Sequence, residues 1–129
     1  MLTIARAPWP STRAPVTVVA GRLPLRSWRS VPRVLVWVMR IRRTLRACPG
    51  VLGHRLGFDV RACALWTASA WSTRTALIHF ERGEVHRRAM TSLRPHVRPS
   101  TFVVWTTDGP GLPAGWDEVQ RRIAAVEHR

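Results

Sequence analysis

The stretch WSTRTALIHFERGEVHRRAM, residues 71–90, decides the fold of this chain. Apolar residues recur in it at the spacing of an amphipathic helix, with Leu77 on the apolar stripe, until Gly83 interrupts the pattern. Ser72 is a suitable N-cap for the first helix, and a second short helix is expected over 84–93. The stretch therefore predicts a broken helix whose backbone turns at Gly83.

Four strands and two further helices are predicted around this broken helix. Short β-branched or alternating runs indicate the strands, and apolar residues at three- and four-residue spacing indicate the helices. The predicted strands cover 16–23, 51–58, 63–71 and 101–107, and the helices cover 31–48 and 116–127. The order strand–helix–strand–strand–helix–strand, with a C-terminal helix, is the βαββαβ pattern of an α+β ferredoxin-like fold with an antiparallel sheet.

The two faces of the predicted sheet need different partners. Both helices of a βαββαβ unit cover one face, and an apolar opposite face has to be covered by something else. The last predicted strand is apolar on both faces, with Phe102 on one and Trp105 on the other. We therefore expect a second sheet from an identical subunit, which would make the protein a homodimer.

A length of 129 residues predicts one domain. Pro8, Pro10 and Pro15 interrupt the first residues, so 1–14 is expected to be a flexible arm before a ferredoxin-like domain over 15–107. Residues 108–129 are expected to be a linker and a helix of the same domain. The longest central apolar run, VLVWVM, is too short to span a bilayer, and two cysteines form no disulfide framework. These features predict a cytoplasmic protein without a membrane partner.

The formal net charge of +14 raises the question of a nucleic-acid partner. All 21 basic residues are arginine, and a genome rich in G and C accounts for much of that preference. The arginines are spread along the chain in singles and doublets, with no continuous basic run. A solvated, arginine-rich surface is therefore the favoured interpretation, and nucleic-acid binding is the less favoured one.

Four short segments make the chain resemble a known superfamily. The run ALWTASAWSTRTALIHF (64–80), followed by HRRAM (86–90), is similar to the dimeric α/β-barrel superfamily of antibiotic-biosynthesis monooxygenases. The segment 50–53 and the strand STFVVWT (100–106) look most like an uncharacterised branch similar to spheroidene monooxygenase. The resemblance covers residues 16–107, and it is more specific for the fold than for the reaction.

The resemblance implies a pocket between the sheet and the helices. Members of such a family oxygenate electron-rich aromatics without a cofactor, degrade haem or oxygenate a carotenoid. The haem-degrading members carry a tryptophan on the second helix and a histidine ten residues later, where this chain has Phe80 and Met90. This departure argues against haem degradation by their route. The cofactor therefore stays open between none and haem.

His86 is the main candidate for chemistry. It lies just after Gly83 and on the same helical face as Met90. It could act as a general base or as an axial ligand to haem iron, but a partly buried histidine at a helix start commonly has only a structural hydrogen bond. Arg74 or Arg29 would stabilise developing negative charge, although exposed arginines are common in this chain.

Several other residues are candidates for the pocket wall. His54 alternates with Leu52 and Leu56 on one strand face and points inward, as a pocket residue or as a hydrogen-bonded core histidine, whereas His79 is expected to be solvated. Aromatic residues line pockets for flat ligands, but they also fill cores and dimer interfaces. The predicted pocket residues are Trp28, His54, Trp66, Trp71, Phe80, Met90 and Trp105.

These observations lead to a function hypothesis with two alternatives. The favoured one is a monooxygenase-like protein that oxygenates or binds an apolar aromatic or polyene small molecule. The first alternative is a non-catalytic domain that binds haem or another small ligand, and the second is a basic nucleic-acid module. No phosphate-binding loop or metal-ligand motif is present in the sequence.

Overall fold

The computed structural model describes residues 1–7, 15–108 and 115–128, which form one five-stranded antiparallel sheet with helices on both faces. The strand order is β1-β3-β4-β2-β5. The strands are β1 (Leu2–Ala7), β2 (Val16–Pro24), β3 (Val51–Asp59), β4 (Ala64–Trp71) and β5 (Thr101–Thr107). The helices are α1 (Val31–Arg46), α2 (Arg74–Glu81), α3 (Glu84–Leu93) and α4 (Trp116–Glu127), with short 3-10 turns η1 (Trp28–Ser30) and η2 (Arg94–His96).

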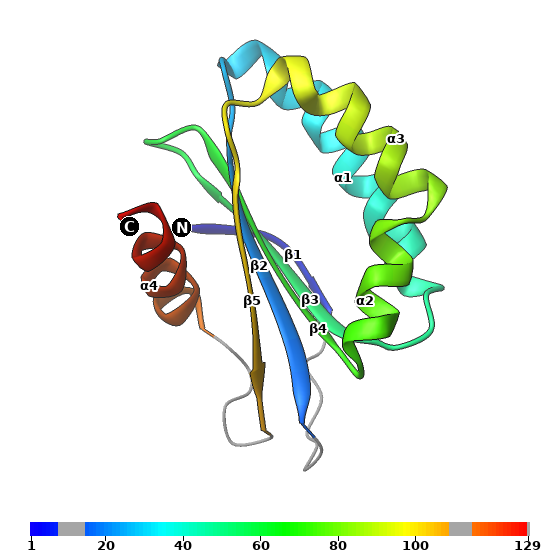
Figure 1. Ribbon diagram of the computed structural model, residues 1–129. Coiled ribbons are helices and arrows are strands. Elements are labelled where there is room, and N and C mark those ends of the chain that lie inside the picture. Colours follow the sequence, from blue (N-terminus) through cyan, green and yellow to red (C-terminus); the bar gives the residue numbers. More distant parts are fainter. Residues whose placement is uncertain (8–14, 109–114, 129) are drawn as a thin grey trace.

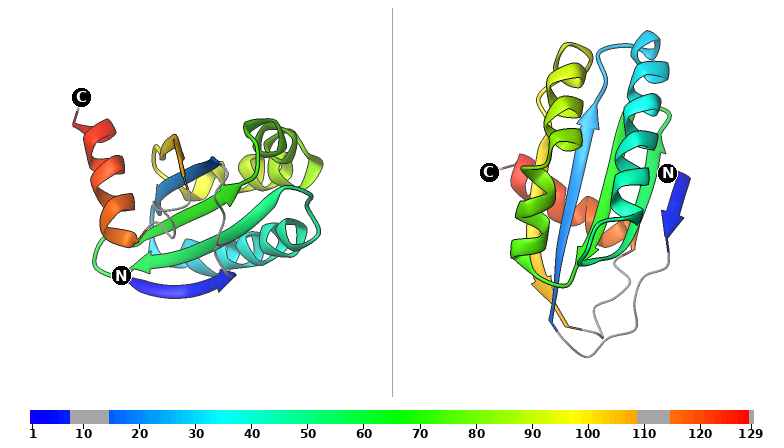
Figure 2. Two further views of the ribbon diagram at one scale, coloured as in Figure 1. Left: turned by 90° about the horizontal axis from the view of Figure 1, so that it is seen from below. Right: turned by 90° about the vertical axis from the view of Figure 1, so that its right-hand side faces the viewer.

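The predicted ferredoxin-like arrangement is confirmed. Helices α1, α2 and α3 cover one face of the sheet, and α4 lies on the other (Figures 1 and 2). Strands β2 and β4 are central, and each pairs antiparallel with both neighbours. The bounds of α3, β5 and α4 match those expected from the sequence. Within the described residues, no helix is long and apolar enough to cross a bilayer.

Side-chain alternation gives the sheet two apolar faces. Leu65 packs with the helices of the α1–α3 layer, whereas Trp66 points to the opposite face and packs under α4. Val119 and Ile123 of α4 have no exposed surface, so this helix buries the centre of its apolar stripe against β2, β4 and β5. The face for which we expected a second subunit therefore carries a helix of the same chain.

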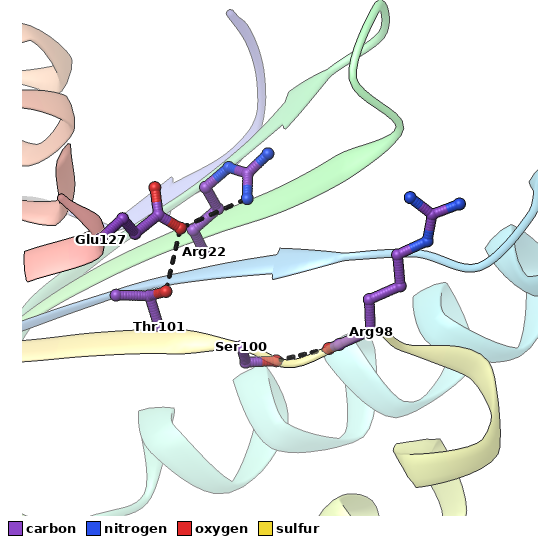
Figure 3. A network of polar contacts seen from close by, with 5 residues as sticks. All are labelled: Arg22, Arg98, Ser100, Thr101 and Glu127. Atoms are coloured by element: carbon purple, nitrogen blue, oxygen red, sulfur yellow. Dashed lines mark hydrogen bonds and ion pairs between the residues drawn. The ribbon is translucent and has the colours of Figure 1, made fainter.

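Helix α4 crosses the sheet and is held at both ends. At its start, Trp116 Nε1 donates to Thr3 Oγ1 over 3.3 Å. At its end, Glu127 Oε2 accepts a 2.9 Å hydrogen bond from Thr101 Oγ1 and lies 3.4 Å from Arg22 Nη1 (Figure 3). These contacts connect α4 to strands at opposite edges and at the centre of the sheet.

The first residues differ from the expected flexible arm, because residues 2–7 form β1. Strand β1 pairs antiparallel with β3, from Leu2 opposite Phe58 to Ala7 opposite His54, with an irregularity between Thr3 and Ala5. Leu2 is 61% exposed, so backbone pairing rather than side-chain burial places this strand. Backbone pairing of this kind leaves no alternation of apolar and polar residues in the sequence, so the sequence did not reveal β1. The rest of the expected arm, residues 8–14, lies outside the described part of the chain.

Two local expectations also need correction. Thr73, not Ser72, caps α2, because its side chain accepts a 3.1 Å hydrogen bond from Ala76 N, while Ser72 N donates to Gly50 O. In β3, the register shifts between Val51 and Gly53, so Leu52 packs on the α4 side instead of sharing a face with His54.

Candidate functional site

A cavity of about 130 Å³ lies between the sheet and the α1–α3 layer. Strands β2, β3, β4 and β5 supply its floor, and α1, α2 and α3 supply its walls. Most of its lining is aliphatic or aromatic. The few polar side chains on it are therefore the groups that would orient a ligand.

Trp71 forms a rigid aromatic wall at the end of β4. It is fully buried, and its Nε1 donates to Ser69 Oγ over 2.9 Å, which satisfies the indole in the core. Its ring centroid lies 5.3 Å from that of Phe80 on α2, with an interplanar angle of 35°. The hydrogen bond and the ring contact together fix the orientation of the indole.

His86 lines the cavity from the first turn of α3, just after the break at Gly83. Its ring lies edge-on to Phe80, with centroids 5.4 Å apart. Burial lowers the pKa of His86, while the charge of Glu81 and a hydrogen bond to the Glu81 backbone partly oppose that shift. A neutral imidazole that donates to a carbonyl leaves its other ring nitrogen free to accept a proton.

His54 and Arg42 form a second polar group on the cavity wall. Arg42 Nε of α1 donates to His54 Nε2 of β3 over 3.2 Å, and His54 is only 3% exposed. Burial lowers the pKa of His54, and the charges of Arg42 and Arg46 lower it further. No carboxylate pairs with Arg42 among the residues that the structure describes. The remaining guanidinium donors can therefore bind a negatively charged oxygen.

The lowered pKa values of His54 and His86 predict a loss of stability in acid. An unfolded histidine titrates near 6.5, and the folded ones bind protons only at lower pH. Between these two pKa values the unfolded state binds more protons than the folded state. The free energy of unfolding therefore falls as the pH is lowered, by up to about 1.4 kcal/mol per pH unit for each histidine. The stability of the protein with both histidines neutral is fully present above the unfolded pKa and is lost as the pH falls through the folded pKa.

Urea unfolding between about pH 8 and about pH 5 measures this dependence. His54→Gln keeps an acceptor for Arg42 without a titrating ring, so it should flatten the acid slope, with exposed His79→Gln as the control. An acid slope that His54→Gln leaves unchanged would show that this histidine does not cause the loss.

The structure brings five of the predicted pocket and catalytic residues to the cavity wall: His54, Trp71, Phe80, His86 and Met90. These residues come from β3, β4, α2 and α3. Both interpretations of His54 hold at once, because it lines the cavity and is also hydrogen-bonded. His79 is exposed, as expected.

Trp66 and Trp105 do not line the cavity, because they point to the α4 face of the sheet. The reason is the alternation of strand side chains: Trp66 is an odd number of residues from Trp71, and Trp105 is an odd number from Phe102. Their indole Nε1 groups are buried without a hydrogen-bond partner among the described residues. Arg122 lies over the Trp105 ring, 4.3 Å from its centroid.

Trp28, Arg29 and Arg74 are on the surface and also lie outside the cavity wall. Trp28 is 55% exposed and contacts Phe58 edge-on, with centroids 5.6 Å apart. Arg74 begins α2 and points into solvent. The arginine at the cavity is Arg42 instead.

Sequence reasoning missed Arg42 and Phe102 as cavity residues. Arg42 follows Val38 by four residues and precedes Leu45 by three, so it interrupts the buried stripe of α1. An arginine in an apolar stripe was a signal for a polar group facing a cavity. Phe102 shares its strand face with Val104, and its ring lies over Gly21, where an added Cβ would come within 2.5 Å of it.

Comparison with known proteins identifies the fold. No protein-family model and no curated protein match the chain. Solved structures do: Rv0793 from Mycobacterium tuberculosis is 17% identical with a TM-score of 0.62, over 71% of this chain and 93% of that one. The cofactor-independent oxygenase SnoaB from Streptomyces nogalater is 15% identical with a TM-score of 0.63, over 73% and 94%. The chain has the fold of antibiotic-biosynthesis-monooxygenase-like proteins.

A third match extends this finding. A protein from Nitrosomonas europaea, provisionally named an antibiotic biosynthesis monooxygenase, is 10% identical with a TM-score of 0.67, over 78% of this chain and 94% of that one. Identities this low establish the fold and not the reaction, because one fold hosts many activities.

Proposed function

We propose that the cavity binds an apolar ring-shaped molecule with an acidic C–H group and supports its oxygenation by O₂ without a bound cofactor. The observation that carries this proposal is an apolar cavity with neutral His86 on its wall and the Arg42–His54 pair as a second polar group. The fold shared with SnoaB, a cofactor-independent oxygenase, supports the choice of reaction class.

The proposed reaction begins with proton transfer from the ring CH₂ to His86. Arg42 stabilises the negative oxygen of the resulting enolate, which passes electrons to O₂. A C–O bond forms, and protonation by the imidazolium gives a carbon-bound hydroperoxide. Cleavage of its O–O bond, with loss of the second C–H proton, releases water. One CH₂ group and one O₂ thus become one carbonyl and one water.

The cavity volume sets the size of the ligand. An engineered apolar cavity of about 150 Å³ holds benzene, so a cavity of similar size takes a molecule with one aromatic ring. Of the two ligand classes expected from the sequence, this favours the aromatic one over an extended polyene. The same volume supports a small aromatic ligand over the larger haem, since pockets for larger ligands measure about 300–1,000 Å³.

The test uses 2-indanone, an aromatic ketone with an acidic CH₂, as the probe. Oxygen uptake and incorporation of ¹⁸O₂ into indane-1,2-dione measure the reaction, and calorimetry measures binding. We expect His86→Ala to lower turnover about a hundredfold or more, because a general base typically contributes that much. His79→Ala removes an exposed histidine of α2 and should leave turnover unchanged.

The outcomes separate the alternatives. Turnover that survives in His86→Ala would remove this residue from the mechanism. Binding of the probe without oxygen uptake would support the alternative that the protein is a non-catalytic ligand-binding domain. A saturable Soret shift with hemin that disappears in His86→Ala would replace the cofactor-free proposal with a haem protein.

Two further expectations belong to the same proposal. We keep the homodimer, now supported by the outer edge of β5, which pairs with no strand in the described chain and carries Phe102 with 50% of its surface exposed. Sedimentation of the protein as a monomer at micromolar concentration would contradict the homodimer. The closer kinship to the spheroidene-monooxygenase branch rests on segments 50–53 and 100–106 and stays a proposal.

A further inference from the structure

The positive charge of the protein is concentrated on the layer of helices that covers one face of the sheet. Residues 31–46 and 74–96, which contain α1, α2, α3 and η2, hold ten arginines and two glutamates, a net charge of +8. Helix α4, on the opposite side, holds three acidic residues and two arginines. Because the α1–α3 layer and α4 lie on opposite faces of the sheet (Figure 1), the charge is asymmetric in space, although it looks dispersed along the sequence.

Helix α1 combines this charge with apolar side chains that face outward. Val36 is 50% exposed and Met39 is 42% exposed. Arg33, Arg40 and Arg43 surround them on the same side of the helix, at three- and four-residue spacing, and all three are exposed. We call these five residues the outer α1 face. Helix α1 contains no acidic residue.

The seam between α1 and α3 adds an aromatic group to this face. Trp37 Nε1 donates to Ser92 Oγ over 2.8 Å, and the guanidinium of Arg40 lies 4.8 Å from the Trp37 ring centroid. Two hollows of about 510 and 300 Å³ flank Trp37, and Arg88 lines both. Helices α1 and α3 lie side by side, so the seam and the outer α1 face form one continuous surface (Figure 2).

We propose that the outer α1 face and its seam with α3 dock on an anionic lipid surface. Arginines at a membrane surface bind lipid phosphates, while neighbouring apolar side chains enter the boundary between headgroups and acyl chains. The arginines complement the negative charge of the lipid phosphates. The exposed Val36 and Met39 favour a lipid over a nucleic acid, because a nucleic acid offers no apolar layer for aliphatic side chains. The docking is peripheral and requires no spanning helix, so it departs from the expectation of no membrane partner, which rested on the length of the apolar runs. It does not depend on the cavity or its reaction.

The test measures partition of the full chain onto vesicles by co-sedimentation at low salt. Vesicles of equal parts phosphatidylglycerol and phosphatidylcholine should bind the protein, and pure phosphatidylcholine should not. The triple variant Arg33→Gln, Arg40→Gln and Arg43→Gln should lose roughly a hundredfold in partition. The double variant Val36→Ser and Met39→Ser should lose about tenfold with its charge unchanged.

The matched control removes the same charge elsewhere. Arg6, Arg61 and Arg121 are exposed and lie outside the α1–α3 layer, so changing all three to glutamine should alter partition much less. Circular dichroism confirms that each variant is folded. All substituted positions are at the surface, so each variant is expected to keep the fold.

Three results would overturn the proposal. One is equal binding to pure phosphatidylcholine. Another is an equal loss of partition in the control and in the outer α1 arginine variant, which would show that binding depends only on the net charge of the protein. The third is full binding by the Val36 and Met39 variant together with tight binding of a single-stranded oligonucleotide that depends on the same arginines, which would make the surface a nucleic-acid site.

Discussion

Replacing Trp71 with alanine is expected to lower the free energy of unfolding by about 3–5 kcal/mol. The side chain is fully buried, packs with Leu45 and Leu77, and satisfies its indole N–H on Ser69. Its loss would leave a void joined to the existing cavity, because the surrounding helices cannot collapse fully into the space. Urea unfolding followed by circular dichroism measures the change.

Trp28→Ala is the matched control for this prediction. Trp28 is 55% exposed and makes one edge contact, with Phe58, so its loss should cost about 1 kcal/mol or less. Equal losses for the two tryptophans would contradict the assigned packing. Trp71→Ala should also admit ligands with a second ring, because the cavity grows on the side of the removed indole.

Replacing Ile123 with alanine is expected to destabilise the protein by about 2–5 kcal/mol. Ile123 has no exposed surface and lies at the centre of the contact between α4 and the sheet. Weaker packing of α4 should give water access to Trp66 and Trp105, whose buried indole N–H groups have no partner among the described residues. Urea unfolding and a red shift of tryptophan emission measure the two effects.

The control on the same helix is Gln120→Ala, which changes an exposed side chain and should alter stability by less than about 0.5 kcal/mol. A stable Ile123→Ala variant with unshifted emission would mean that α4 does not cover this face in solution. The face would then be open to a second subunit in the parent chain as well, and sedimentation would show the parent and the variant self-associating to the same extent.

Local sequence patterns were sufficient for most elements of the fold. The break at Gly83, the helix Glu84–Leu93 and the strand Thr101–Thr107 follow from residues a few positions apart, which interact within one turn or one strand. The same patterns placed His86 and Met90 on one wall. Alternation also contained the information that Trp66 and Trp71 lie on opposite faces, although the predicted pocket grouped them together.

The candidate site was less accessible to sequence reasoning, because it joins residues from different elements. Arg42 and His54 are twelve positions apart and meet across the gap between α1 and β3. Arg29 and Arg74 have the same chemistry as Arg42, and only their position on the surface distinguishes them. Side-chain type was therefore informative, but the choice among 21 arginines was not possible without coordinates.

The sequence by itself determined the order of the elements and the apolar character of both sheet faces, because these depend on short-range periodicity. Only the tertiary structure decided that β1 pairs with β3, that α4 covers the second face, and that ten of the dispersed arginines belong to the α1–α3 layer. Backbone pairing and the convergence of distant side chains depend on how elements pack in three dimensions, and no local pattern records that packing.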